Sequence, residues 1–198
     1  MKTQRGFTLI ELLTVMLMMG LVASVMLYNF RQGDRQKRIN LARDSVILAL
    51  RTAQNYTLAG KLIPPPAFAP HVRGNARCAS DNSPVSYWVE FNTSTTYNLM
   101  VEDNCGAVMR VQQFSLVQST GFLTSAQPFS LANGSGTTNA SNLSVRFSAP
   151  FAVMTGTTAA NPLPANFGSF ATTTARIQTQ DGSRTLDVVI DGISGKIE

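Results

Sequence analysis

The stretch Leu12–Phe30 reads LLTVMLMMGLVASVMLYNF, and it contains 19 residues without a charged side chain. Glu11 precedes this stretch and Arg31 follows it. As an α-helix it would be about 28 Å long, which is close to the hydrocarbon thickness of a bilayer. The pattern therefore predicts one membrane-spanning helix near the N-terminus.

A cleaved secretory signal peptide is the alternative for this segment. Lys2 and Arg5 supply the basic start of such a signal, and Val22-Ala23-Ser24 offers small residues at a cleavage site. The apolar run is, however, long for the hydrophobic region of a signal peptide. Glu11 also places a carboxylate where it is costly at membrane depth, which indicates a dedicated partner for this side chain.

The segment GFTLIEL at residues 6–12 follows a short basic leader and precedes the apolar run. It resembles the N-terminal signal of type IV prepilins and type II secretion pseudopilins. The resemblance implies that a prepilin peptidase cuts between Gly6 and Phe7 and methylates the new Phe7 amine. It also implies that Glu11 pairs with the Phe7 amine of a neighbouring subunit during assembly.

The helical pattern continues beyond the apolar run. A face of apolar residues recurs at three- and four-residue steps at Ile39, Ala42, Val46, Ala49, Ala53 and Tyr56. We expect this face to be widened by Leu41, Ile47, Leu48, Leu50 and Leu58 and to pack against a sheet. Gly60 and Pro64-Pro65-Pro66 predict the end of the helix.

The rest of the chain has the alternation of β-strands. Ser86–Phe91 and Tyr97–Val101 predict a hairpin, and Ala175–Gln180 is expected to pair with Thr185–Ile190. Further strands are predicted at Val108–Val117, Leu143–Phe147, Phe151–Met154 and Gly195–Ile197, with loops at Asn133–Asn139 and Gly156–Phe170.

A helix followed by strands predicts an α+β fold, with one long N-terminal helix packed on an antiparallel β-sheet head. We expect a leader at residues 1–6, a transmembrane half of the helix at 7–30, an amphipathic half at 31–62 and a β-rich head at 63–198. The later chain also resembles the GspH/FimT branch of pseudopilins. The similar segments are the helix end LRTAQNYTLAG at residues 50–60 and the ending DGISGKI at residues 191–197.

Composition argues against an enzyme or a metal centre. The chain has one His and two Cys, and His71 lies in a proline-rich segment without a nucleophile arrangement nearby. Glu102-Asp103-Asn104 and the pair Asp187/Asp191 offer oxygen ligands for Ca²⁺, but no loop has EF-hand-like spacing, so we interpret the acids as turn-forming surface residues. No cofactor and no metal are expected.

Cys78 and Cys105 flank the first predicted hairpin. An extracytoplasmic head permits a disulfide between them, which would add roughly 3 kcal/mol in the chain-entropy treatment. Two unrelated free thiols are the alternative.

The net charge is +5, from 16 Lys+Arg against 11 Asp+Glu, and becomes +3 (14 minus 11) without Lys2 and Arg5. A net charge of this size is weak evidence for nucleic-acid binding. Some FimT-like minor pilins, the branch that this chain resembles, bind DNA through an arginine-bearing C-terminal stretch. The corresponding stretch here, Asp191–Glu198, carries one Lys and no Arg, so it departs from the DNA-binding pattern. The scattered arginines Arg73, Arg77, Arg110, Arg146, Arg176 and Arg184 are interpreted as solvated surface residues. For the denser cluster Arg31–Arg38, lipid phosphates or acids on neighbouring subunits are the expected partners.

The sequence therefore predicts a membrane-anchored minor pilin or pseudopilin that assembles into a type II secretion pseudopilus or a type IV pilus. Expected partners are the prepilin peptidase, other pilin or pseudopilin subunits and the inner-membrane assembly platform. We expect a single pass through the cytoplasmic (inner) membrane with the head outside the cytoplasm. The alternatives are a DNA-binding minor pilin for competence DNA uptake, a major pilin, and a surface-adhesive tip.

Overall fold

The structure is a computed structural model that describes residues 8–60, 84–92, 95–104, 106, 108–118, 120–122, 127–133, 136–160, 162, 164–180 and 182–198. The chain forms two compact units, Met1–Lys37 and Arg38–Glu198. Helix α1 (Leu9–Leu58) contributes residues to both units. The two units are described separately below.

The first unit consists, in its described part, of the N-terminal portion of α1. Leu and Met are the most frequent residues of this portion, and both are good helix formers. Its apolar side chains are exposed, with Leu21 at 61% and Phe30 at 73%. By length and composition α1 is able to cross a membrane, and the most apolar stretch is not buried inside the protein.

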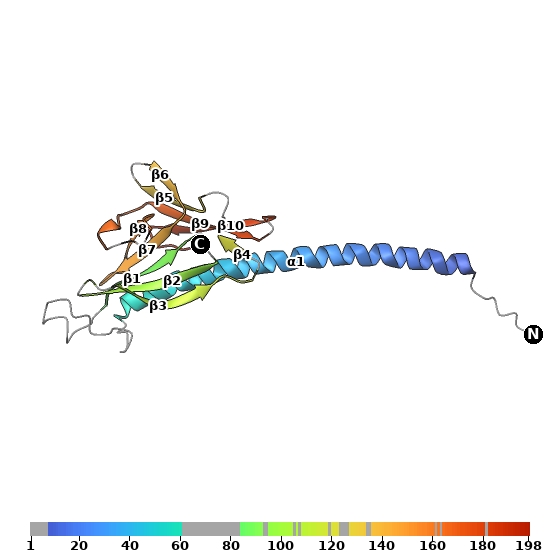
Figure 1. Cartoon of the computed structure of the whole chain (residues 1–198), viewed down its shortest axis with the longest axis horizontal. Helices are drawn as coiled ribbons and strands as arrows, with labels where there is room; N and C mark the ends of the chain where they lie inside the picture. Colours follow the sequence, from blue (N-terminus) through green and yellow to red (C-terminus); the bar gives the residue numbers. More distant parts are fainter. Residues whose placement is uncertain are drawn as a thin grey trace, which may run out of the picture. The chain divides into compact units, whose positions relative to one another are not determined.

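The second unit contains two antiparallel sheets (Figure 1). Sheet A has the strand order β3-β2-β1-β7-β8. Its strands are β1 (Pro84–Phe91), β2 (Thr96–Asp103), β3 (Val108–Ser115), β7 (Leu143–Ser148) and β8 (Val153–Thr157). Every neighbouring pair is antiparallel, with Val89 of β1 opposite both Leu99 of β2 and Val145 of β7.

Sheet B has the order β10-β9-β5-β6, and β4 also pairs with β9. Its strands are β4 (Thr120–Phe122), β5 (Phe129–Asn133), β6 (Gly136–Ala140), β9 (Thr172–Thr179) and β10 (Thr185–Asp191). A short 3-10 helix, η2 (Pro164–Asn166), precedes β9. The C-terminal tail lies along β10, where Ile197 bridges Ile190 and the Glu198 backbone exchanges two hydrogen bonds with Val189.

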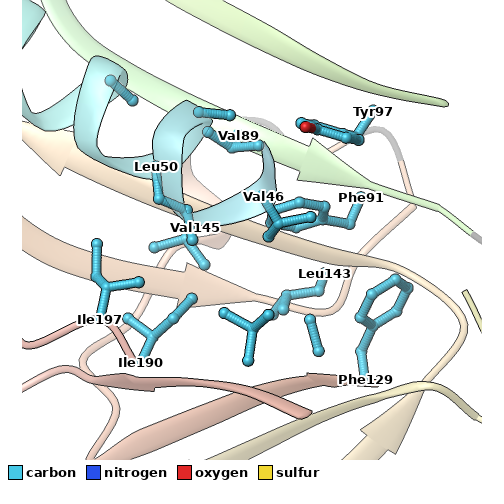
Figure 2. Close-up of a cluster of buried hydrophobic side chains, with 14 of the residues drawn as sticks. Val46, Leu50, Val89, Phe91, Tyr97, Phe129, Leu143, Val145, Ile190 and Ile197 are labelled. Carbon is cyan, nitrogen blue, oxygen red and sulfur yellow. The ribbon is translucent and has the colours of Figure 1, made fainter. Parts of the chain in front are cut away.

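One hydrophobic core joins the second half of α1 to both sheets. Figure 2 shows Val46 and Leu50 of α1 among Val89, Phe91 and Val145 of sheet A. Sheet B contributes Phe129 and Ile190 to the same cluster. The helix positions that are fully buried are Ile39, Ala42, Val46, Ala49, Leu50 and Ala53.

The α+β fold predicted from the sequence is confirmed. The hairpin β1–β2 and the pair β9–β10 occur where the alternation indicated. The predicted widening of the helix face is wrong for Leu41, Leu48 and Leu58, whose side chains are 56%, 63% and 56% exposed. At about 100° of rotation per residue, these three leucines point away from the side of α1 that carries Val46 and Ala49.

Two other boundaries differ from the sequence prediction. Asn133–Asn139 does not form a continuous loop, because β5 runs to Asn133 and β6 begins at Gly136. The β6 side chains are exposed or half-buried, so this edge strand needs no apolar alternation, and its threonines suit a strand. The strand predicted from Phe151 starts at Val153 instead, because Phe151 and Ala152 form a turn in which Ala152 has a φ of 50°.

Candidate assembly site at the start of helix α1

Thr8 is the residue at which α1 is capped. It is not helical itself, and α1 begins at Leu9. The backbone N–H of Glu11 donates to Thr8 Oγ1 at 3.4 Å, while the backbone N–H of Thr8 donates to Glu11 Oε2 at 3.3 Å. The Thr8 hydroxyl also donates to Glu11 Oε2 at 3.1 Å. This reciprocal arrangement is a capping box, in which two orphan donors of the first turn are satisfied.

The capping box determines where the Glu11 carboxylate lies. Both hydrogen bonds from Thr8 go to Oε2, and in the described part of the chain no hydrogen bond reaches Oε1. The carboxylate also lies at the N-terminal, positive end of the helix macrodipole, where an acidic side chain stabilises a helix. Glu11 is therefore held in place through one oxygen while the other is available to a partner.

The capping role of Thr8 was not predicted from the sequence. The spacing Thr-x-x-Glu before an apolar run is a known signature of a helix N-terminus, and it would have identified Thr8 as the cap. Gly6 and Phe7, the predicted cleavage and methylation residues, lie outside the described residues. Glu11 is described, and it stands in the first turn of α1.

An apolar surface follows Glu11 along α1. Met18, Met19, Val22 and Met26 line a shallow open hollow of about 530 Å³ on this surface. Met19 is 68% exposed and Met26 is 58% exposed. Such a surface is stable in lipid or against another apolar helix, and it is costly in water.

Residues 1–27 match a protein family described as the prokaryotic N-terminal methylation motif. This match, together with the α+β arrangement, supports the type IV pilin and pseudopilin family for the chain. No curated protein and no solved structure matches the chain.

The methylation motif also indicates the general role of the chain. It supports a structural, pilin-like subunit rather than an enzyme. It implies processing by a prepilin peptidase and assembly with other pilin subunits. With the apolar helix, it supports anchoring in a membrane.

The other candidate residues are distributed over the head. Cys78 and Cys105, the predicted disulfide, lie outside the described residues, as does His71. Among the residues that the structure describes, no group of three or more His, Cys, Asp or Glu side chains is placed to hold a metal ion.

Glu102 and Asp187, two of the candidate calcium ligands, form ion pairs with arginines of the head. Glu102 Oε2 accepts from Ser86 Oγ at 2.9 Å and from Arg146 Nη2 at 2.5 Å. Asp187 binds Arg176 through both carboxylate oxygens, at 2.8 and 3.0 Å. These carboxylates therefore neutralise arginines across the strands.

Asp191 closes the C-terminal turn. Its Oδ1 accepts backbone N–H groups from Ile193 and Ser194 at 2.8 and 3.0 Å. The hydrogen bonds from Ser194 and Ile193 lower the pKa of Asp191. This is the geometry of an Asx turn, so the interpretation of Asp191 as a turn-forming acid agrees with the structure.

Some of the head arginines that could bind DNA instead form ion pairs within the head. Arg146 is mostly buried against Glu102 and lies 5.4 Å from the centre of the Phe167 ring. Arg176 is held by Asp187. Arg73 and Arg77 lie outside the described residues. Arg146 and Arg176 are thus paired with acids of the head, which reduces the positive charge that these two residues offer to a phosphate backbone.

Proposed function

We propose that the chain is a minor pilin or pseudopilin of the GspH/FimT kind. In this proposal it assembles through its N-terminal helix into a type II secretion pseudopilus or a type IV pilus. The observation that carries the proposal is the methylation motif at residues 1–27, followed by an exposed apolar helix with Glu11 in its first turn.

Processing is the first step of the proposal. A prepilin peptidase cuts the chain between Gly6 and Phe7 and methylates the new amine of Phe7. Gly6 suits the site of cleavage because it has no side chain and its backbone extends easily. After the cut, Phe7 carries a positive charge about one helical turn away from the carboxylate of Glu11.

Pairing between subunits is the second step. The Phe7 amine of one subunit binds the Glu11 carboxylate of its neighbour, with Oε1 as the accepting oxygen, because Thr8 already occupies Oε2. Both groups are poorly solvated at the membrane boundary, so each stabilises the other there. The pair thereby selects a neighbour at the correct axial position.

The membrane arrangement follows from the same motif. The Leu12–Phe30 span crosses the inner membrane once, and the head folds outside the cytoplasm. The inner-membrane assembly platform then moves the helix from lipid into the filament. The apolar hollow at Met18, Met19 and Val22 supports this step, because the same surface suits lipid tails and a second helix.

The GspH/FimT assignment has support from two segments. The helix end at residues 50–60 and the ending at residues 191–197 resemble this branch. In the structure the first segment carries the buried Ala53 and Thr57, and the second places Ile197 in the core. Both segments therefore have a structural role in the head.

The test uses the full chain in cells that assemble the filament. Glu11→Ala removes the carboxylate, and Asp44→Ala removes an exposed acid of the same helix as the matched control. We expect both variants to enter the membrane, while only Glu11→Ala loses incorporation into the sheared filament fraction and cross-linking to other subunits. Incorporation of Glu11→Ala at the wild-type level would contradict the proposed pairing.

A further inference from the structure

The helix α1 changes from apolar to basic within two residues. Phe30 ends the apolar run and is 73% exposed, and Arg31 follows it. Two residues before Phe30, the Tyr28 hydroxyl accepts a hydrogen bond from Gln32 Nε2 at 2.9 Å. Tyrosine is enriched at membrane–water interfaces, with its ring on the apolar side and its hydroxyl on the polar side. If α1 spans a bilayer, Tyr28 and Gln32 are suited to the plane at which the hydrocarbon layer ends.

Three basic side chains of the first unit follow this plane, and we name them the juxtamembrane cluster: Arg31, Arg35 and Lys37. All three are exposed on α1. Arg38, the next residue, begins the second unit. Asp34 is the one acidic residue in the interval 31–37, so the interval has a net charge of +2, from three cations minus one anion. Glu11, the nearest other acid towards the N-terminus, lies at the opposite end of the apolar run.

The axial positions of the cluster match the lipid headgroup layer. Arg31, Arg35 and Lys37 lie about 1.5, 7.5 and 10 Å beyond Phe30 along a helix. The headgroup layer of each leaflet is roughly 5–8 Å thick, since about 30 Å of a bilayer 40–45 Å thick is hydrocarbon. The long stems of Arg and Lys let their charged ends bend back towards this layer. All three cations can therefore reach the lipid phosphates.

We propose that the juxtamembrane cluster binds the headgroups of anionic phospholipids. Arginine guanidinium groups bind phosphate oxygens with two parallel hydrogen bonds, and lysine adds a point charge. A lipid phosphate lies at this depth around every copy of the chain that spans a bilayer. The proposal needs only the membrane span, and it does not depend on which filament the chain enters.

Lipid is a better partner for the cluster than an acid of a second parallel copy. Two parallel copies at the same depth would place one net +2 interval beside another, which is repulsive. Anionic lipids between the copies neutralise this repulsion. The cluster thus has a consequence for assembly: anionic headgroups would let the membrane-embedded copies approach one another.

The experiment compares lipid binding by full-length variants in detergent. Native mass spectrometry counts the phosphatidylglycerol and phosphatidylcholine molecules, of identical acyl chains, that remain bound to each protein. The variants are Arg31→Gln, the triple change R31Q/R35Q/K37Q, and Arg51→Gln. Arg51 is an exposed arginine of α1 in the second unit, so Arg51→Gln makes the same change in net charge as Arg31→Gln. Glutamine has a helix propensity close to that of arginine and lysine, so α1 should remain intact.

We expect the wild type and Arg51→Gln to retain phosphatidylglycerol with the same preference. Each basic residue near an anionic surface strengthens binding about five-fold, so Arg31→Gln should lower the preference by about that factor. The triple variant should lose most of the preference, and the exposed Arg38 that it retains accounts for any remainder. Added inorganic phosphate should not displace phosphatidylglycerol from the wild type, whereas added salt should weaken the preference.

Three results would overturn the proposal. One is an equal preference in the wild type and in the triple variant. Another is a loss in Arg51→Gln as large as that in Arg31→Gln. The third is an unchanged lipid preference with a loss of cross-linking between copies in the triple variant, which would assign the cluster to acids of a neighbouring subunit. Resistance to carbonate extraction, measured for every variant, separates lipid preference from membrane anchoring.

Discussion

The Ser45 hydroxyl on α1 lies 2.7 Å from the Tyr97 hydroxyl on β2. The Tyr97 ring is fully buried, stacks on Phe114 with ring centres 5.3 Å apart, and lies 5.5 Å from the ring of Phe91. This polar contact is therefore surrounded by aromatic packing where the helix meets sheet A. The Thr57 hydroxyl of α1 makes a second polar contact with the same sheet, to the Phe147 carbonyl at 3.3 Å.

Removing the hydrogen bond between Ser45 and Tyr97 should have a modest and non-additive effect. Tyr97→Phe and Ser45→Ala should each lower the free energy of unfolding of the head by about 1 kcal/mol. The double variant should be close to either single variant, because the same bond is lost once. Chemical denaturation of a chain from Gln32 to Glu198 measures all three. Fully additive losses would show that the two hydroxyls act independently.

The head should fold without the membrane span. Arg38–Glu198 is a compact unit with its own core, so a chain from Gln32 to Glu198 should be a soluble monomer. In this chain Val46→Asp should cost several kcal/mol, because it buries an unpaired charge. Leu48→Asp is the control, and its effect should stay within about 0.5 kcal/mol because Leu48 is 63% exposed.

Denaturation midpoints of the two variants decide this prediction. A midpoint for Val46→Asp near that of Leu48→Asp would mean that the Val46 face of α1 is not core. The α+β packing of the head would then be wrong.

The stability of the head should fall in alkaline solution. Burial, and to a lesser extent the charge of nearby Tyr56, raises the pKa of Tyr87 from 10.0 to about 12. The folded state therefore favours the neutral phenol, whereas the unfolded state ionises at the ordinary pKa. The resulting stabilisation is complete below pH 10.0 and is lost as the pH rises towards about 12.

Tyr87→Phe tests this pH dependence. The variant should show a smaller decline in the free energy of unfolding across that interval than the wild type. Unfolding curves at several alkaline pH values, with tyrosinate absorbance as a second signal, provide the measurement. An equal decline in the free energy of unfolding of both proteins would show that ionisation of Tyr87 is not the cause.

Local patterns predicted several of the elements with apolar alternation, although β5, with buried Phe129 and Leu131, was not among them. Ile39, Val46 and Ala53 repeat with helical spacing, and Tyr87, Val89 and Phe91 alternate along β1, so both core faces are readable from the sequence. The strand β6 was missed because its side chains are polar and its pairing with β5 is supported by the backbone. Leu41 and Leu48 were misjudged because hydrophobicity alone does not give the direction of a helix face.

The partition of the strands into two sheets could not be read from local patterns. β5 pairs with β9 across a long sequence separation, and β7 pairs with β1, so the order of strands depends on contacts distant in sequence. At the N-terminus the sequence motif identified Glu11 through a resemblance. Thr8, which holds Glu11, required attention to capping chemistry.

Thr8 should stabilise the first turn of α1. Thr8→Val keeps a residue of similar shape but removes the hydroxyl that bonds Glu11, which should cost about 0.5–2 kcal/mol locally. Amide hydrogen exchange of residues 9–12 in detergent micelles should become faster. Thr14→Val is the control, since the Thr14 hydroxyl bonds only the Glu11 carbonyl, at 2.9 Å. Equal rates of amide exchange in the Thr8→Val variant and the wild type would show that Thr8 does not stabilise the first turn of α1.

Processing after Gly6 is the part of the proposal on which the pilin-like role depends most directly. The decisive measurement is the intact mass of the full chain purified from cells with and without a prepilin peptidase, for the wild type and for Gly6→Leu. We expect that only the wild type with the peptidase loses residues 1–6 and gains one methyl group on Phe7. Cleavage after Ser24, or equal processing of Gly6→Leu, would contradict the proposal.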